Sequence, residues 1–264
     1  MPLVGLVPAG GVASRLGAMP CSKEILPVGI GDGPGTARVA CDPLLEAFAS
    51  AGVRRCVMVL GHGKWDVPAF LGDGSRVGLD LAYLTVRESP NGPTTLDRAY
   101  EHVRGCRVVF GFPDILIGPS DLFDPLVQMQ EEGGADVVLG LFPAADPSLV
   151  DMVELDDDGR VRAVLPKPEQ TSLRYTWLVA VWGAAFTELL HDGAPWAADG
   201  REVYVGDVIN AAVRSGLTVM GSVVPDGHYL DVGTPAKLAA ALRGELGGDQ
   251  ADQAEGTPRP TAST

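Results

Sequence analysis

The chain opens with the segment LVGLVPAGGVASRLGAMPCSKEILPVG, residues 3–29. Its first seven residues form an apolar run typical of a buried strand, and the pair Gly10–Gly11 follows. Glycines at a strand end permit positive φ and let backbone N–H groups approach an anion closely. Arg15 and Lys23 then add two positive charges suited to a polyphosphate. The segment predicts either an anion site beyond the first strand or a plain loop with two solvated cations.

Short apolar runs alternate with amphipathic segments through the first half of the chain. This alternation indicates βαβ units and a doubly wound, mostly parallel, Rossmann-like α/β sheet. Such sheets bind ligands at the carboxyl ends of their strands, which is where Gly10 and Gly11 lie. The pattern predicts strands at 3–9, 54–61, 79–86, 106–112 and 135–142, with helices at 42–52, 64–71, 94–104 and 121–132.

The second half changes character. An Asp-Gly turn inside residues 149–168 predicts a β-hairpin, which forms a small β-rich lobe. The tail, 247–264, has almost no bulky apolar residue, so we expect it to be disordered. We therefore expect one domain, 1–246, with halves of about 1–145 and 146–246. Further strands are predicted at 177–183 and 217–224, and helices near 184–192, 205–215 and 235–244.

Composition restricts the class of partner. The chain has 264 residues, 46% of them hydrophobic, and a net charge of −14, which argues against nucleic acid and anionic membranes as partners. No run of about 18 apolar residues predicts a membrane span, and the N-terminus lacks the basic start of a signal peptide. The cysteines have no C-x-x-C spacing, so we expect free thiols in a reducing cytoplasm; they are Cys21, Cys41, Cys56 and Cys106.

Two carboxylates follow strand-like runs far apart in the sequence. Asp114 ends the run in VVFGFPDILIG (108–118), and Asp231 lies in GHYLDVGTP (227–235). Two such residues can share Mg²⁺, which prefers oxygen ligands and keeps waters and substrate phosphates. The alternative interpretation of each Asp, taken alone, is a helix N-cap or turn residue, and only the pair together favours a metal site. Lys167 lies between prolines in LPKP (165–168), either as an aimed amine or as a surface lysine.

Taken in order, these motifs resemble the sugar-1-phosphate nucleotidylyltransferases, and most closely the short glucose-1-phosphate thymidylyltransferases. The resemblance extends to about residue 242. The opening motif and the Asp-x-Gly-Thr motif carry most of its specificity. The matching text comprises AGGVASRL (9–16), SKEILPV (22–28), LGDGSRVGLDLAY (71–83), ESPNG (88–92), FPD (112–114), PKP (166–168), EVYVGDVI (202–209) and YLDVGTP (229–235).

The resemblance implies that an acceptor phosphate oxygen attacks the α-phosphate of a nucleoside triphosphate and pyrophosphate leaves. In such a step the protein mostly positions groups and stabilises charge. Arg15 and Lys23 would stabilise the α-phosphate and pyrophosphate, Asp114 and Asp231 would hold Mg²⁺, and Lys167 would hold the acceptor phosphate. The nucleotide half would bind through Ala9, Gly10, Gly11, Ser14, Arg87 and Gly92, and the acceptor half through Asp151, Lys167, Glu202 and Tyr229.

The chain departs from the family pattern at the residues that choose the substrates. Arg87 replaces a base-reading glutamine, and Val150–Asp151 and Pro166 replace a Tyr-Gly pair and a Glu that contact the hexose. The base is therefore open, and so is the acceptor: a hexose or modified sugar phosphate, a cyclitol or polyol phosphate, a phosphonate or a molybdopterin-type phosphate. A non-catalytic nucleotide-sugar-binding homologue is the alternative. Members of the family are often oligomeric, so a homo-oligomer is also expected.

Overall fold

The computed structural model describes residues 1–11, 14–30, 37–194, 196 and 202–245. The predicted disordered tail, 247–264, lies outside this part of the chain, and so does the side chain of Ser14. Among the described residues, no helix has the length and apolarity needed to cross a bilayer.

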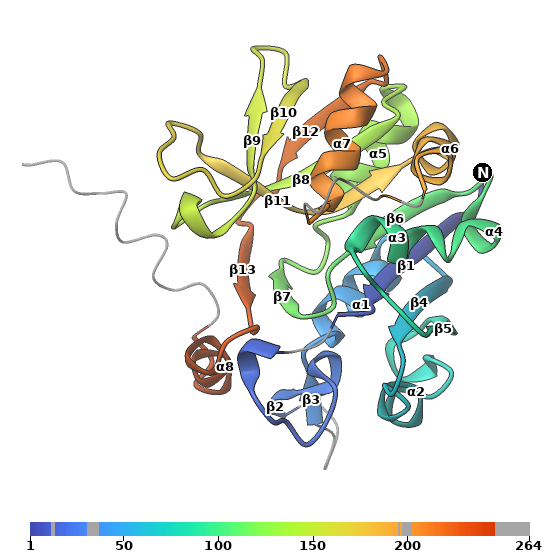
Figure 1. The fold of residues 1–264 in the computed structure, drawn as a ribbon, viewed down its shortest axis with the longest axis vertical. Coiled ribbons are helices and arrows are strands. Elements are labelled where there is room, and N and C mark those ends of the chain that lie inside the picture. Colours follow the sequence, from blue (N-terminus) through green and yellow to red (C-terminus); the bar gives the residue numbers. More distant parts are fainter. Residues whose placement is uncertain (12–13, 31–36, 195, 197–201, 246–264) are drawn as a thin grey trace, which may run out of the picture.

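A mixed nine-stranded sheet forms the centre of the molecule (Figure 1). Strands β6, β1, β4 and β5 lie side by side in that order and are parallel. The predicted Rossmann-like, mostly parallel sheet is thereby confirmed for this half. The four strands are β1 (Leu3–Ala9), β4 (Arg55–Gly61), β5 (Asp80–Val86) and β6 (Arg107–Gly111).

The strand β11 (Tyr175–Trp182) joins the two halves of the chain into one sheet. It runs antiparallel to β6 on one side and to β8 (Val137–Pro143) on the other. Beyond β8 lies the parallel strand β12 (Val219–Val223). The predicted hairpin is present as β9 (Met152–Leu155) and β10 (Val161–Leu165), paired antiparallel at the edge beside β11.

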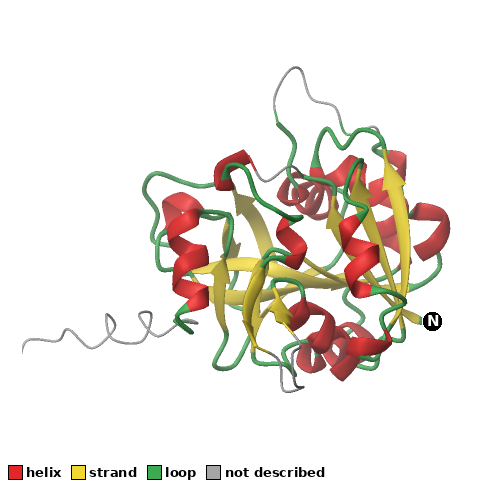
Figure 2. Cartoon of the chain, turned by 90° about the horizontal axis from the view of Figure 1, so that it is seen from below, coloured by secondary structure: helices red, strands yellow, loops and turns green. Residues whose placement is uncertain are grey.

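Helices cover both faces of this sheet (Figure 2), which is the doubly wound arrangement. Alternate residues of β1 explain why: Val7 and Ala9 pack into one apolar core, and Val4 and Leu6 into the other. The first core includes side chains of α1 (Asp42–Ser50), α2 (Asp66–Leu71) and α5 (Asp124–Glu132). The second includes side chains of α3 (Gly92–Asp97), α4 (Tyr100–Val103), α6 (Ala184–Asp192) and α7 (Val205–Arg214).

Two small antiparallel sheets lie outside the main one. The first pairs β2 (Pro27–Ile30) with β3 (Ala37–Val39). The second pairs β7 (Ile115–Gly118) with β13 (His228–Asp231), and Figure 1 shows this pair between the hairpin lobe and the β2–β3 sheet. The helix α8 (Pro235–Leu242) follows β13, with the Thr234 side chain accepting from Lys237 N as its N-cap.

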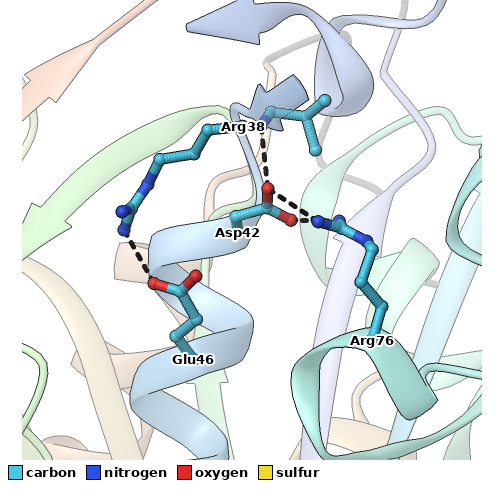
Figure 3. A network of polar contacts seen from close by, with 5 residues as sticks. Arg38, Asp42, Glu46 and Arg76 are labelled. Carbon is cyan, nitrogen blue, oxygen red and sulfur yellow. Dashed lines mark hydrogen bonds and ion pairs between the residues drawn. The ribbon is translucent and has the colours of Figure 1, made fainter. Parts of the chain in front are cut away.

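A buried carboxylate links three of these elements (Figure 3). Asp42, at the start of α1 and 1% exposed, accepts from Val39 N at 2.8 Å and from the guanidinium of Arg76. Arg76 belongs to a 3₁₀ turn, η3 (Ser75–Val77), before β5. Arg38 pairs with Glu46 of α1 at 2.7 Å on the more exposed side. The network fixes α1 between β3 and η3.

The structure corrects the expected elements in two respects. The helix expected over 94–104 is two helices, α3 and α4, with a turn at Arg98 and Ala99. The strands β2, β3 and β7 were not expected from the sequence, and the motif at 229–235 begins inside a strand, β13.

Candidate active site

The carboxyl ends of the four parallel strands meet at one edge of the sheet. From β1 the chain proceeds through β4 and β5 on one side, and then crosses to β6 on the other. The strand order therefore reverses between β1 and β6, and ligands bind beyond such a reversal. Gly10 follows β1, and Asp114 lies three residues past the end of β6. The topology thus brings the first two predicted motifs together.

Gly10 is held where no side chain fits. A Cβ added to Gly10 would lie 2.2 Å from Ser89 Oγ and 2.7 Å from Ser89 Cβ. A Cβ added to Gly61, at the end of β4, would lie 2.5 Å from the Gly10 carbonyl oxygen. The neighbouring strand ends therefore pack directly against the Gly10 backbone, with the Ala9 side chain buried behind it.

Lys23 reaches into the space beyond this turn. Its Nζ donates to Asp114 Oδ2 at 2.5 Å, and lies 3.9 Å from where a Gly11 Cβ would be. Burial lowers the pKa of Lys23, but the carboxylates of Asp114, Glu24 and Asp231 outweigh burial and raise it overall. The amine therefore stays charged, as a phosphate-binding group must.

Of the two predicted metal carboxylates, Asp231 lies on β13 and Asp114 immediately precedes β7, the strand that pairs with it. The β7–β13 register places Asp231 opposite Ile115, and Val232 N donates to the Asp114 carbonyl at 3.1 Å. Asp231 Oδ1 accepts from Gly233 N at 2.8 Å. The guanidinium of Arg15 lies 3.5 Å from the position of a Gly233 Cβ. Segments at least 91 residues apart in the sequence therefore bring Arg15, Lys23, Asp114 and Asp231 together.

This set of carboxylates fits Mg²⁺ bound jointly with substrate. Within the described part of the chain, no group of three or more His, Cys, Asp or Glu side chains could hold a metal by itself. Two carboxylates are the number that Mg²⁺ usually takes from protein when phosphates and water complete its octahedron. Asp114 and Asp231 therefore suit a metal that arrives with a triphosphate.

A cavity of about 440 Å³ opens next to these groups. Arg15, Asp114 and Asp231 line one part of it, and residues that flank the β9–β10 hairpin, together with residues of β11, β13 and α8, line much of the rest. Of the predicted acceptor residues, the cavity is lined by Asp151, Lys167 and Tyr229. A volume of this order accommodates a small ligand such as a phosphorylated sugar.

Lys167 enters the cavity from a strained backbone. Its φ is +39°, which a side-chain-bearing residue seldom adopts. Its Nζ lies 5.6 Å from the ring centroid of Tyr204, a cation–π distance. The Tyr204 hydroxyl donates to Glu202 Oε2 at 2.6 Å. Glu202 is thereby hydrogen-bonded to Tyr204, which lines this wall of the cavity. Among the described residues that line the cavity, Glu202 itself is not included.

Asp151 contributes a half-buried carboxylate to the same wall. Burial raises its pKa, the Lys167 ammonium opposes that rise, and Asp207 adds to it. Its backbone is fixed because Thr176 Oγ1 donates to the Asp151 carbonyl at 2.8 Å. Its Oδ2 lies 3.3 Å from the position of a Gly206 Cβ, at the first turn of α7. The Asp151 carboxylate therefore offers a hydrogen-bond acceptor to a ligand bound in this cavity.

Two further predicted nucleotide residues, Arg87 and Gly92, lie close in the sequence to Ser89, which contacts Gly10. Arg87 follows β5 and is exposed. Gly92 begins α3, where a Cβ would lie 3.2 Å from Val205 Cγ2. The preceding Asn91 caps this helix by accepting from Thr94 N at 2.9 Å. Arg87 and Gly92 lie on the two segments that flank Ser89, which contacts Gly10.

Sequence reasoning missed several residues of this region. Tyr204, Trp177 and Lys237 line the cavity, and Lys64 pairs with the buried Glu24 beside Lys23. Tyr204 lay inside the EVYVGDVI motif, so that motif could have indicated it. Lys64 carried no sequence signal, because its partner is 40 residues away in the chain.

Comparisons with known proteins find relatives among the nucleotidyltransferases. No protein-family model matches the chain. A low-salt glycan biosynthesis nucleotidyltransferase of Haloferax volcanii is 25% identical over 248 residues, which cover 90% of this chain and 64% of that protein. A glucose-1-phosphate thymidylyltransferase of an Actinoplanes species is 29% identical over 246 residues, covering 90% and 76%. A mannose-1-phosphate guanylyltransferase of Mycobacterium tuberculosis is 28% identical over 193 residues, covering 73% and 52%.

The chain is a homologue of the sugar-1-phosphate nucleotidylyltransferases. The resemblance stated from the motifs is thereby confirmed. A crystal structure assigned as a glucose-1-phosphate thymidylyltransferase from Bacillus anthracis superposes with a TM-score of 0.78 at 18% identity, covering 91% of this chain and 94% of that one. That likeness shows a shared fold. The chain spans about half to two thirds of the full length of three of its curated nucleotidylyltransferase relatives.

Proposed function

We propose that this protein is a nucleotidylyltransferase that joins a nucleoside triphosphate to a phosphorylated sugar-like acceptor, giving an NDP-sugar and pyrophosphate. The observation that carries the proposal is the convergence of Arg15, Asp114 and Asp231 in the wall of one cavity, with Lys23 hydrogen-bonded to Asp114. Two cations and two carboxylates beside a glycine turn are what a triphosphate with its metal requires. The curated relatives, named as thymidylyl-, guanylyl- and glycan biosynthesis nucleotidyltransferases, support it.

In the proposed reaction an oxygen of the acceptor phosphate attacks the α-phosphorus of the triphosphate. That new P–O bond forms as the bond between the α-phosphorus and the bridging oxygen breaks, and pyrophosphate leaves with the bond's electrons. Lys23 and Arg15 stabilise the charge that develops on the α-phosphate and on the leaving group. No proton needs to be removed from the nucleophile, because a phosphate oxygen is already anionic at neutral pH.

Asp114 and Asp231 would hold Mg²⁺, which neutralises phosphate charge when bound. Gly10 and Gly11 would offer backbone N–H groups to the nucleotide, with Ala9, Ser14, Arg87 and Gly92 around them. Arg87, which can pair bidentately with a base edge, is our proposed reader of the base. These assignments are supported by the position of the turn at the strand ends.

The acceptor would lie in the cavity beneath the hairpin lobe. Lys167 would bind its phosphate, and Asp151 and Tyr229 would contact its body, with Glu202 acting through Tyr204. The nucleotide-binding half would then be about 1–145 and the acceptor half about 146–246. We also propose a cytoplasmic location, which four unpaired cysteines support. A homo-oligomer is part of the same proposal.

The test is a pyrophosphate-release screen of the full chain. Each nucleoside triphosphate is combined with a panel of hexose-1-phosphates, amino-sugar, cyclitol and polyol phosphates and phosphonates, with and without Mg²⁺. We expect Mg²⁺-dependent release with at least one pair and formation of the corresponding nucleotide-linked product. Tight nucleotide-sugar binding with no release for any pair would contradict the proposal and favour a non-catalytic homologue.

A further inference from the structure

Ser22 and Glu24, the two sequence neighbours of Lys23, are hydrogen-bonded to side chains of one short segment, residues 64–66. Ser22 donates to the Asp66 carboxylate through its backbone N at 2.6 Å and through its Oγ at 2.7 Å. On the other side, Lys64 Nζ donates to Glu24 Oε1 at 2.6 Å. Lys64 lies in the connection from β4 to α2, and Asp66, two residues later, is the first residue of α2. Side chains of segment 64–66 therefore hold the chain in place immediately before and immediately after Lys23.

The Glu24–Lys64 ion pair is buried, and a buried ion pair is an unusual way to stabilise a loop. Glu24 is 0% exposed, and the side chain of Lys64 is 13% exposed. Glu24 Oε2 has no hydrogen-bond partner within the described residues. Burial lowers the pKa of Lys64, Glu24 opposes this, and the nearby Lys23 lowers it further. Buried ion pairs contribute little net stability against apolar replacements, so stability alone does not explain this pair.

The 3₁₀ turn η2 (Lys23–Ile25) that carries Lys23 is only three residues long. Its own hydrogen bonds are Ile25 N to Ser22 O at 3.0 Å and Leu26 N to Lys23 O at 3.3 Å. Cys41 N also donates to Glu24 O at 3.0 Å, which ties the turn to the start of α1. While Glu24 pairs with Lys64, the Lys23 side chain extends to Asp114 and toward Gly11.

We infer that Lys64, Glu24 and Asp66 are positioning residues that aim the Lys23 ammonium at the triphosphate. The inference rests on the proposed function, because it assigns these residues to the same site. None of the three needs to touch substrate. They act through Lys23, whose Nζ must lie within hydrogen-bond distance of the reacting phosphates in the transition state. Displacing such a group by about 1 Å lowers the rate by on the order of 10²-fold.

The experiment separates positioning from folding with one single and one paired variant. Lys64→Met leaves Glu24 buried without its cation, and we expect kcat for pyrophosphate release to fall by roughly 10- to 100-fold. Lys64→Arg should recover most of that loss, and Asp66→Ala should repeat it. The paired variant Glu24→Leu with Lys64→Met removes both charges, so it should fold with a Tm near that of the wild type and still keep the low kcat.

The matched control is Arg76→Met, which strips the cation from another buried carboxylate, Asp42; neither residue lines the cavity. It should lower Tm and leave kcat within about twofold of wild type. A paired Glu24→Leu, Lys64→Met variant with wild-type kcat would overturn the inference. So would an Arg76→Met variant whose kcat falls as far as that of Lys64→Met.

A second readout works without turnover. Hydrogen exchange at the amides of Leu26 and Cys41 reports whether η2 loosens when both charges are removed. Faster exchange at these amides in the paired variant supports positioning, and unchanged exchange overturns it. If the wild type releases no pyrophosphate with any substrate pair, the proposed function fails, and exchange at these two amides decides the inference by itself.

Discussion

Replacing Gly10 with alanine is predicted to destabilise the fold at the turn that follows β1. The new Cβ would lie 2.2 Å from Ser89 Oγ, 2.7 Å from Ser89 Cβ and 3.1 Å from Thr95 Cγ2. Ser89 cannot simply rotate away, because its hydroxyl is hydrogen-bonded to Thr95 Oγ1. Overpacking of this kind costs about 1–3 kcal/mol, which corresponds to a Tm lower by roughly 2–12 °C in a domain of this size.

Gly11→Ala is the matched control for Gly10→Ala. At Gly11 the nearest atom to an added Cβ is Lys23 Nζ at 3.9 Å, an ordinary contact, so Tm should stay within about 2 °C of wild type. Adding Ser89→Gly to Gly10→Ala removes the clashing side chain and should restore a large part of the lost Tm. The four proteins of the Gly10–Ser89 cycle are compared by calorimetry, because Ser89→Gly has an effect of its own. Equal Tm values for Gly10→Ala and Gly11→Ala, or no coupling between Gly10 and Ser89, would refute the reasoning.

Three further predictions concern charge. Lys167→Met should raise the KM for the acceptor by roughly 10- to 100-fold, as expected for loss of a charged hydrogen bond, with a much smaller effect on the KM for the triphosphate in steady-state kinetics; equal effects on both would contradict the assignment. Chelating divalent metal with EDTA should abolish pyrophosphate release, and added Mg²⁺ should restore it; release that persists after chelation would remove the metal role. His191 Nδ1 donates a hydrogen bond to Asp97 Oδ1, which raises the pKa of the exposed imidazole above its ordinary 6.5. The stabilisation from this pair is therefore present below the ordinary pKa and is lost as pH rises through the folded pKa. The Tm difference between wild type and His191→Gln should shrink as pH rises above that ordinary value, and a constant difference would be inconsistent with the pairing.

The sheet was largely predictable because burial leaves a simple pattern. Strands β1 and β4 are buried on both faces, so they read as continuous apolar runs bounded by turn residues. The strand β13 gives no such signal: its four residues are all half-buried, and its partner β7 lies more than a hundred residues earlier. Its pairing depends on the course of the whole second half, which local periodicity does not contain.

The predicted site residues show the same division. Asp114 and Asp231 could be proposed as metal ligands from the sequence, because each follows an apolar run and lies at a turn. Lys64 and Tyr204 were not singled out, since their roles come from partners that the fold supplies, Glu24 in one case and Lys167 in the other. A single sequence shows which charged residues follow strands, but not which buried charged residues pair with them or with their neighbours in the fold.

Pyrophosphate release by Asp114→Asn and by Asp231→Asn tests the central claim most directly, with Asp157→Asn on the exposed β9–β10 turn as the control. Both carboxylates line the cavity, and we propose that the metal and the triphosphate meet beside them. With a substrate pair that the wild type uses, each site variant is predicted to lose on the order of 10²-fold or more in kcat at unchanged Tm, while the control keeps wild-type turnover. Wild-type turnover in either site variant would contradict the account.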